Sequence, residues 1–347
     1  MHKKLIAILV IFLAIPIILV NCSLRPIKIM QNYEKDNTKA IDSDSIVVGF
    51  SQLGWESDWR TANTKSIQNA LTEENGFSLI FSNGRQKQEN QIKDVRSFIF
   101  QEVDYIVIAP TIETGWDTVL EEAKEAGIPV IIVDRMIDTK DTSLYISSVG
   151  TDKYAEGRKA GQWLEHFLEN KRGANSPLLN TDTINIVELD GTMNSTAQIG
   201  RSSGFNDIVK NHKNWKILTQ ESGEFTKAKG KEVMARLLNR FNDIDVLISQ
   251  NDDMTFGAIE AIQEAGLTCG EYGDIAIISF DAVSEAFDKM EKGLINVDIE
   301  CNPLQGPLIA EIIERLEKGE MVNKEYYVDE KIFEAKNAKK DRVGRSY

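Results

Sequence analysis

Residues 105–134 read YIVIAPTIETGWDTVLEEAKEAGIPVIIVD. Residues 105–109 and 130–134 are near-continuous apolar runs with the length of a buried strand. Residues 116–126 between them have the apolar spacing of an amphipathic helix, and a Gly-Ile-Pro sequence ends that helix. Strands that are apolar on both faces are typical of a parallel sheet covered by helices on both sides. This segment therefore predicts a doubly wound α/β fold.

The same alternation of strand and helix patterns runs along most of the chain and starts again after residue 150. Two consecutive α/β units without a long linker predict two Rossmann-like lobes, with parallel sheets, joined by a hinge. We expect an N-terminal lobe from residues 46–149 plus 302–325 and a C-terminal lobe from residues 150–301 plus 326–347. The other expected strands are residues 46–50, 78–81, 145–149, 184–188, 217–220, 246–249, 275–280 and 295–299. The other expected helices are residues 58–75, 90–102, 153–169, 196–209, 227–241 and 252–265, with two more starting at about residues 284 and 303.

The chain is acidic, with a formal net charge of −14 over 347 residues. Removal of the first 21 residues would take away Lys3 and Lys4 and leave a mature charge of −16. So acidic a surface argues against nucleic acid as a partner. The apolar fraction of 42% is enough for large cores, so a globally disordered chain is not expected.

The amino terminus has the features of a targeting segment. Two lysines precede the apolar residues 5–20, a stretch that is short for a spanning helix. It ends in Leu19-Val20-Asn21-Cys22, which resembles the lipobox of bacterial lipoproteins except at Asn21. We expect a lipoprotein signal peptide, lipidation at Cys22, a flexible polar tether over residues 22–45, and an extracytoplasmic protein anchored to the cell membrane. An uncleaved signal anchor is the alternative.

Only two further cysteines are present, Cys269 and Cys301. Two cysteines form neither a disulfide framework nor a zinc pattern, so no metal site is expected. We expect two buried, unpaired thiols, with a single disulfide as the alternative.

Polar and aromatic side chains follow several of the expected strands. Ligands of open parallel sheets bind at the carboxyl ends of the strands, and a cleft between two lobes is a preferred place for a small molecule. Trp and Phe can stack on the C–H face of a sugar, whereas Arg, Asp and Asn can hydrogen-bond its hydroxyls. The candidate ligand-binding residues are Trp59, Arg60, Asp134, Arg135, Phe225, Asn251, Asp281 and Glu300. Taken singly, each has a simpler reading as a packing residue, a helix cap, a turn or an ion pair.

Motifs for catalysis and for cofactor binding are missing from the sequence. There is no phosphate loop, no dinucleotide fingerprint, no nucleophile elbow and no zinc-protease motif, so neither a cofactor nor a catalytic residue is expected. The histidines are His2, His166 and His212, and none lies near a candidate nucleophile. A glycosidase that uses Asp281 and Glu300 as its carboxylate pair is a less favoured alternative.

Several short stretches together resemble the type I periplasmic sugar-binding proteins of the ribose-binding family, and most of all its galactofuranose-binding branch. The resemblance runs from about Val47 to the last 20 or so residues. It rests on these stretches: Gly49-Phe50-Ser51-Gln52 with Trp59-Arg60, residues 86–93, Ala109-Pro110, Thr114-Gly115-Trp116, Asp134-Arg135, residues 230–234, residues 251–254 and Gly257-Ala258.

The resemblance implies a monomeric, non-enzymatic receptor. Its lobes would close on a monosaccharide, galactofuranose-like or a related pentose or hexose, and present it to an ABC transporter permease. A sensor that presents its closed form to a membrane histidine kinase is the alternative.

The resemblance also implies roles for the candidate residues. Trp59 and Arg60 would line the first-lobe wall, Asp134 and Arg135 would bind ring hydroxyls, Phe225 would stack, and Asn251, Asp281 and Glu300 would complete the second-lobe wall. The family pattern has an arginine at the position of Ile199, and Arg201 lies two residues further on, so direct ligand contact by Arg201 is not expected. Trp55, Asp58 and Gly200 also depart from the pattern, so the sugar itself is left open.

Overall fold

The computed structural model describes residues 45–171 and 183–347, apart from the side chain at position 171. The expected signal peptide, the lipidation site Cys22 and the tether up to residue 44 lie outside the described residues. All described residues belong to one compact unit, Asp44–Tyr347. Among the helices of these ranges, none is both long and apolar enough to cross a membrane.

Two six-stranded sheets form the framework. In the first sheet all strands are parallel. Its order is β11 (Glu325–Tyr327), β5 (Ser147–Gly150), β4 (Val130–Asp134), β3 (Tyr105–Ile108), β1 (Ile46–Gln52) and β2 (Phe77–Asn83). In the second sheet the edge strand β12 is antiparallel and the rest are parallel. Its order is β12 (Ile332–Glu334), β10 (Val297–Glu300), β9 (Ala276–Asp281), β8 (Val246–Ser249), β6 (Ile184–Asp190) and β7 (Trp215–Ser222).

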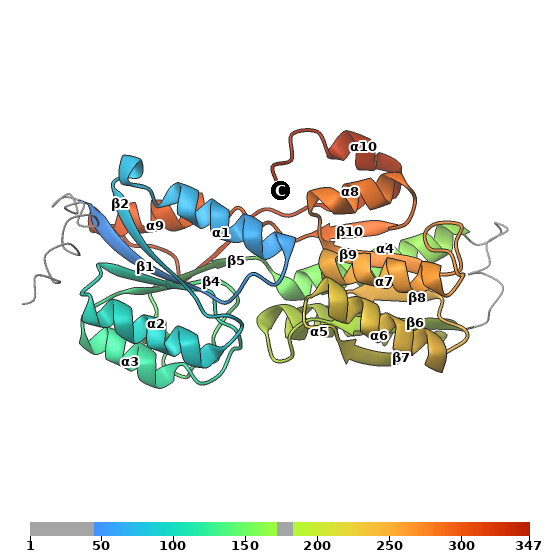
Figure 1. The fold of residues 1–347 in the computed structure, drawn as a ribbon, viewed down its shortest axis with the longest axis horizontal. Helices are drawn as coiled ribbons and strands as arrows, with labels where there is room; N and C mark the ends of the chain where they lie inside the picture. The colour runs from blue at the N-terminus through green and yellow to red at the C-terminus, as the bar shows by residue number, and fades with distance from the viewer. Residues whose placement is uncertain (1–44, 172–182) are drawn as a thin grey trace, which may run out of the picture. The chain divides into compact units, whose positions relative to one another are not determined.

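Helices cover both faces of the first sheet (Figure 1). On one face lie α1 (Asp58–Ala70) and α9 (Gly306–Glu317), and on the other lie α2 (Gln88–Phe100) and α3 (Asp117–Glu125). Each pair buries its apolar stripe on the sheet: Ile67 and Ile312 pack on one side, and Phe98 on the other. Burial of such side chains supplies most of the stability of the layer.

The second sheet is covered in the same way. Its helices are α4 (Lys153–Lys171) and α5 (Thr196–Val209) on one face, with α6 (Lys227–Arg240), α7 (Asp252–Glu264) and α8 (Ser284–Glu291) on the other, and the short α10 (Ala338–Asp341) beside α8. Glycines let α4 and α5 approach closely, since a Cβ at Gly157 would overlap the carbonyl oxygen of Arg201. This close approach brings the Arg201 side chain next to the start of α4.

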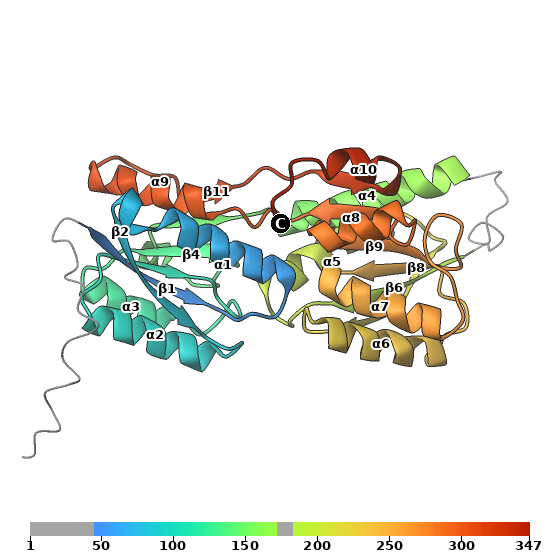
Figure 2. The same cartoon turned by 45° about the horizontal axis from the view of Figure 1, so that its top comes forward.

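The chain passes between the two sheets three times, and the connecting segments can be seen in Figure 2. The first passage leads from β5 to α4, the second from β10 to α9, and the third from β11 to β12. The third passage lies between Tyr327 and Ile332.

The predicted fold class, two doubly wound lobes with parallel sheets, is confirmed. The expected strands at residues 130–134 and 246–249 and the expected helix at 196–209 coincide with the observed ones. The helix expected over residues 58–75 ends at Ala70, because Leu71 leaves the helical conformation and Glu73–Asn75 form a separate 3-10 turn, η1. The edge strands β11 and β12 were not expected, since three residues are too few for a periodic signal.

Candidate functional site

The carboxyl ends of strands from both sheets surround one cavity. Seven of the eight candidate residues line it, each less than a tenth exposed. The full lining is Glu56, Ser57, Trp59, Arg60, Asp134, Arg135, Lys153, Ala197, Arg201, Phe225, Asn251, Asp281 and Cys301. The candidate that is missing from this lining is Glu300.

The first-sheet wall of the cavity begins where β1 gives way to α1. Ser57 caps α1 by accepting a hydrogen bond from the backbone N–H of Arg60, which fixes the first turn of the helix. The Arg60 guanidinium lies between two carboxylates, with Nε 2.9 Å from Glu56 and Nη2 2.7 Å from Asp134. It also lies over the Trp59 ring, 4.6 Å from the ring centroid. Burial opposes charge on Arg60, but the two carboxylates outweigh burial and raise its pKa.

Asp134 ends β4 in a left-handed backbone conformation, with φ at 64°. Such a conformation is costly for a residue other than glycine, and strain of this kind is concentrated at functional sites. Burial alone would raise the pKa of Asp134, yet the cations Arg60, Lys153 and Arg135 lower it. For Arg135, burial and the charge of Arg60 lower the pKa to about 10. At neutral pH the wall therefore presents fixed opposite charges.

Three buried polar atoms of this wall form no hydrogen bond with any described residue. They are Oε2 of Glu56, Nη1 of Arg60 and Nε of Arg135. A buried polar atom without a partner costs about 1–3 kcal/mol, and more when it is charged. One acceptor and two donors are thus left for a molecule that can both donate and accept hydrogen bonds.

The second-sheet wall is centred on Arg201 of α5. Its guanidinium lies 2.6 Å from Glu156 and 3.3 Å from Asp281, and it also donates to the backbone carbonyl of Gln250. Asp281 ends β9 with φ at 108°. Burial raises the pKa of Asp281 well above its ordinary value, and Arg201 opposes that shift. Each of the three guanidinium nitrogens of Arg201 therefore has a partner within the protein.

Phe225 supplies the aromatic part of the second-sheet wall, and Asn251 supports it. Asn251 caps α7 by accepting from the backbone N–H of Met254, and its amide donates to the carbonyl of Phe225 at 3.2 Å. The Phe225 ring lies against Gly191, where a Cβ would overlap it, and the Arg135 guanidinium lies 5.3 Å from its centroid. Asn251 thus acts as a helix cap that also holds the aromatic ring in place.

Lys153 and Cys301 lie between the two walls. The Lys153 ammonium is 2.8 Å from the Cys301 sulfur, 3.3 Å from Asp134 and 3.5 Å from Glu156. The indole N–H of Trp59 donates to the Cys301 carbonyl at 2.5 Å. Burial raises the pKa of the Cys301 thiol, which keeps it neutral. Both Cys269 and Cys301 are free and buried, as expected from the sequence.

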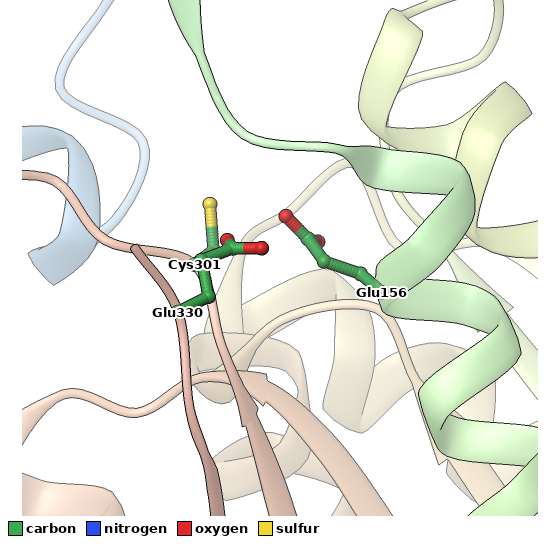
Figure 3. A group of neighbouring side chains, drawn as sticks. All are labelled: Glu156, Cys301 and Glu330. Atoms are coloured by element: carbon green, nitrogen blue, oxygen red, sulfur yellow. The ribbon is translucent and has the colours of Figure 1, made fainter. Parts of the chain in front are cut away.

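Figure 3 shows Glu156, Cys301 and Glu330, whose possible ligand atoms lie within 4.8 Å of one another. A thiol and two carboxylates could in principle hold a metal ion. Here the Lys153 ammonium already contacts the thiol and Glu156, and Arg201 contacts Glu156 as well. Two resident cations would repel a metal ion, so this group does not fit a metal site.

Glu300, which was expected to complete the second-lobe wall, does not line this cavity. Glu300 ends β10, but its carboxylate accepts from Arg345 at 2.8 Å, from the Tyr347 hydroxyl at 2.7 Å and from the backbone N–H of Lys331 at 2.8 Å. These C-terminal groups hold the side chain outside the cavity lining. Of Asp281 and Glu300, the pair considered for a glycosidase, only Asp281 lines the cavity.

Sequence reasoning missed three charged residues of the cavity. Glu56 precedes the α1 cap, Lys153 is the first residue of α4, and Arg201 was expected to make no direct contact with a ligand. A signal was available for two of them, since Glu56 and Lys153 both stand just beyond the end of a strand. Arg201 lies in the second turn of α5, so a rule that looks only at residues following a strand does not identify it.

Comparison with known proteins gives independent evidence for the family of this chain. Residues 48–320 match the family model of the periplasmic binding protein domain. The chain is 42% identical over 283 residues to the galactofuranose-binding protein YtfQ of Escherichia coli K12, which covers 80% of this chain and 85% of that protein.

Two solved structures are similar over most of their length. One is the crystal structure of a galactofuranose binding protein, with a TM-score of 0.79 and 40% identity over 86% of this chain and 97% of the other. The second is the periplasmic binding protein of the arabinose ABC transporter of Shewanella sp. ANA-3, bound to arabinofuranose, with a TM-score of 0.78 and 42% identity over 85% and 94%. The resemblance inferred from the sequence is confirmed.

Proposed function

Because the chain belongs to the family of periplasmic binding proteins, we propose that it captures a monosaccharide in this cavity and delivers it to an ABC transporter permease. The sugar would be held between two lobes with the boundaries expected from the sequence. We further propose an extracytoplasmic monomer without catalytic activity, anchored to the membrane through a lipid on Cys22. Ligand contacts that exist only when the lobes are closed would stabilise the closed state.

The observation that carries this proposal is the set of unpaired atoms on Glu56, Arg60 and Arg135. Each sugar hydroxyl is both a donor and an acceptor, so one polyol can satisfy a carboxylate oxygen and two guanidinium nitrogens together. The rings of Trp59 and Phe225 line the same cavity and offer faces for the apolar C–H groups of a sugar ring.

A sugar in furanose form is the ligand class we favour. The support comes from the two similar structures, which are a galactofuranose binding protein and a receptor bound to arabinofuranose. Hydrogen bonds to charged side chains contribute about 1.5–3 kcal/mol each, so a wrong epimer that leaves one of them unmade would bind roughly tenfold or more weakly.

Titration calorimetry with D-galactose, L-arabinose, D-ribose and D-fructose tests the proposal. We expect saturable binding of at least one of these sugars, and mass spectrometry of the purified protein should identify any sugar that copurifies. The variant Glu325→Gln, which changes an exposed carboxylate away from the cavity, should bind the same sugar equally well. Absence of binding heat with every sugar, together with no copurifying sugar, would refute the proposal.

A further inference from the structure

The turn between β9 and α8 carries Asp281 into the cavity lining in a strained backbone conformation. Asp281 ends β9 with φ at 108°, and the next residue, Ala282, has φ at 60°. Two consecutive positive φ angles are costly for residues other than glycine, and such a conformation persists only where surrounding groups hold it. The groups that hold this turn therefore decide where the Asp281 carboxyl group points.

Two buried carboxyl groups hold the amide side of the turn. The backbone N–H of Ala282 donates to Asp298 of β10 at 3.0 Å, and that of Val283 donates to Asp252 of α7 at 2.8 Å. Both acceptor residues are fully buried. The sheet and the helix next to β9 thus fix the N–H groups of the turn.

The carbonyl side of the turn is held by a residue from much further along the chain. Nη2 of Arg345 donates to the Ala282 carbonyl at 2.7 Å, and Nη1 of the same guanidinium donates to Glu300 at 2.8 Å. A planar guanidinium can bind two acceptors at fixed angles, which a lysine ammonium does not match. Arg345 therefore joins the end of β10 to the turn that follows β9.

Arg345 is itself held in one place. Its side chain is 11% exposed, and its guanidinium lies 4.9, 4.6 and 4.5 Å from the ring centroids of Phe287, Phe333 and Tyr347. The Tyr347 hydroxyl also donates to Glu300 at 2.7 Å. Contacts between a cation and aromatic faces, together with the Glu300 ion pair, keep the guanidinium against the turn.

We propose that Arg345 is a positioning residue for sugar binding, which holds the β9–α8 turn so that the Asp281 carboxyl group faces the cavity. The inference rests on the proposed function. Arg345 is not among the residues that line the cavity, so it acts on the ligand through Asp281, whose Oδ1 lies 3.3 Å from Arg201. Without the bond from Arg345 the turn relaxes toward ordinary φ angles, and the Asp281 side chain leaves its place in the lining.

Glu300 supports this arrangement without being essential to it. A glutamine at this position keeps an oxygen that can accept from Nη1 of Arg345, and the aromatic rings and the Ala282 carbonyl still hold the guanidinium. The affinity of Glu300→Gln for the sugar should therefore stay close to that of the wild type. Removal of the guanidinium itself should not be tolerated in the same way.

Titration calorimetry of the full chain with the sugar that binds from the panel of D-galactose, L-arabinose, D-ribose and D-fructose tests the inference. Arg345→Met should raise the dissociation constant roughly tenfold, because the Ala282 carbonyl loses a charged donor. Arg342→Met is the matched control. It removes a 41% exposed arginine that pairs with Asp288 and Glu291 away from the cavity, so the dissociation constant should stay within about twofold. Urea denaturation without sugar shows whether each variant is folded at the temperature of the titration.

A double-mutant cycle separates positioning of Asp281 from general support of the fold. Asp281→Gly removes the side chain and keeps the backbone conformation, since glycine adopts positive φ angles without strain. In that background Arg345→Met should change the dissociation constant by less than about twofold, because no side chain is left to position. An equal loss of affinity in both backgrounds would overturn the inference. If Asp281→Gly binds too weakly to measure, Arg345→Met and its control decide.

Arg345→Lys tests the same point if the methionine variant does not fold. The ammonium keeps the charge beside Glu300 but cannot make both bonds of the guanidinium, so the dissociation constant should rise by about threefold. Wild-type affinity in Arg345→Met, or in Arg345→Lys where the methionine variant is unfolded, would overturn the inference and leave the proposed function intact. No binding of any sugar by the wild type would overturn both.

Discussion

The two walls of the cavity differ in how far their polar groups are already satisfied. On the first-sheet wall Glu56, Arg60 and Arg135 each retain a buried polar atom without a hydrogen bond. On the second-sheet wall Arg201 is bound to Glu156, Asp281 and a backbone carbonyl, and Asn251 bonds Met254 and Phe225. The first wall therefore keeps hydrogen-bonding capacity for a ligand, whereas the second wall is a preassembled scaffold.

This difference separates binding from stability. Loss of a satisfied buried charge pair leaves its partner uncompensated, so changes in the second wall should destabilise the protein. On the first wall Arg60 is itself ion-paired with Glu56 and Asp134, but Arg135 makes few bonds within the protein, so a change at Arg135 should act mainly on affinity. The following predictions test that separation, beginning with the largest expected effect.

Arg201→Met should lower the free energy of unfolding by about 3–5 kcal/mol, because Glu156 and Asp281 lose the buried cation they share and only Glu156 keeps another, Lys153. Urea denaturation without sugar measures it. Arg240→Met, which removes an arginine side chain that is 59% exposed, should change that free energy by no more than about 0.5 kcal/mol. A loss of less than about 1 kcal/mol for Arg201→Met would show that the second wall is not the scaffold described here.

Arg135→Met should weaken sugar binding by about 10- to 100-fold, with a smaller effect on stability than Arg201→Met. Among the described residues Arg135 donates one side-chain hydrogen bond, to the Thr111 carbonyl, and its ion contacts with Glu56 and Asp134 are long, at 3.9 Å. One bond from a charged donor to a ligand contributes about 1.5–3 kcal/mol. Calorimetry gives the dissociation constant and urea denaturation the stability. An unchanged dissociation constant would contradict the role of the first wall.

Gly191→Ala should weaken sugar binding by roughly 5- to 20-fold. The new Cβ would overlap the Phe225 ring, and relief of such crowding costs about 1–3 kcal/mol. The ring would have to leave the place where it lines the cavity. Phe225→Leu is the control, because it removes the aromatic face and leaves Gly191 unchanged. If stacking by Phe225 is what Gly191→Ala disturbs, both variants should lose a similar amount of affinity. Normal affinity in Gly191→Ala would rule out stacking by Phe225.

Glu300→Gln should leave the dissociation constant within about twofold of the wild type, because the side chain binds Arg345 and Tyr347 outside the cavity. Its free energy of unfolding should fall by about 1–3 kcal/mol, since Arg345 loses a charged acceptor. A loss of affinity of tenfold or more would restore Glu300 as a residue of the ligand site.

The sequence alone predicted most strands and helices of the fold, because the apolar periods of strands and helices are local signals. The rule that ligands bind at strand ends then identified seven of the cavity residues, Asp134 and Asp281 among them. The same rule did not bring Glu300 into the lining, since its side chain contacts Arg345 and Tyr347, some 45 residues further along the chain. Arg201 was not expected to contact the ligand. Its place in the lining depends on how closely α5 approaches α4, and glycines in the sequence allow such an approach without predicting it.

The central claim is that the unpaired atoms of the first wall receive the hydroxyl groups of one sugar. A crystal structure of the complex with the sugar identified by calorimetry tests it directly. The account predicts sugar oxygens within about 3.2 Å of Oε2 of Glu56, Nη1 of Arg60 and Nε of Arg135. A sugar bound elsewhere, or one that leaves these three atoms without a partner, would contradict it.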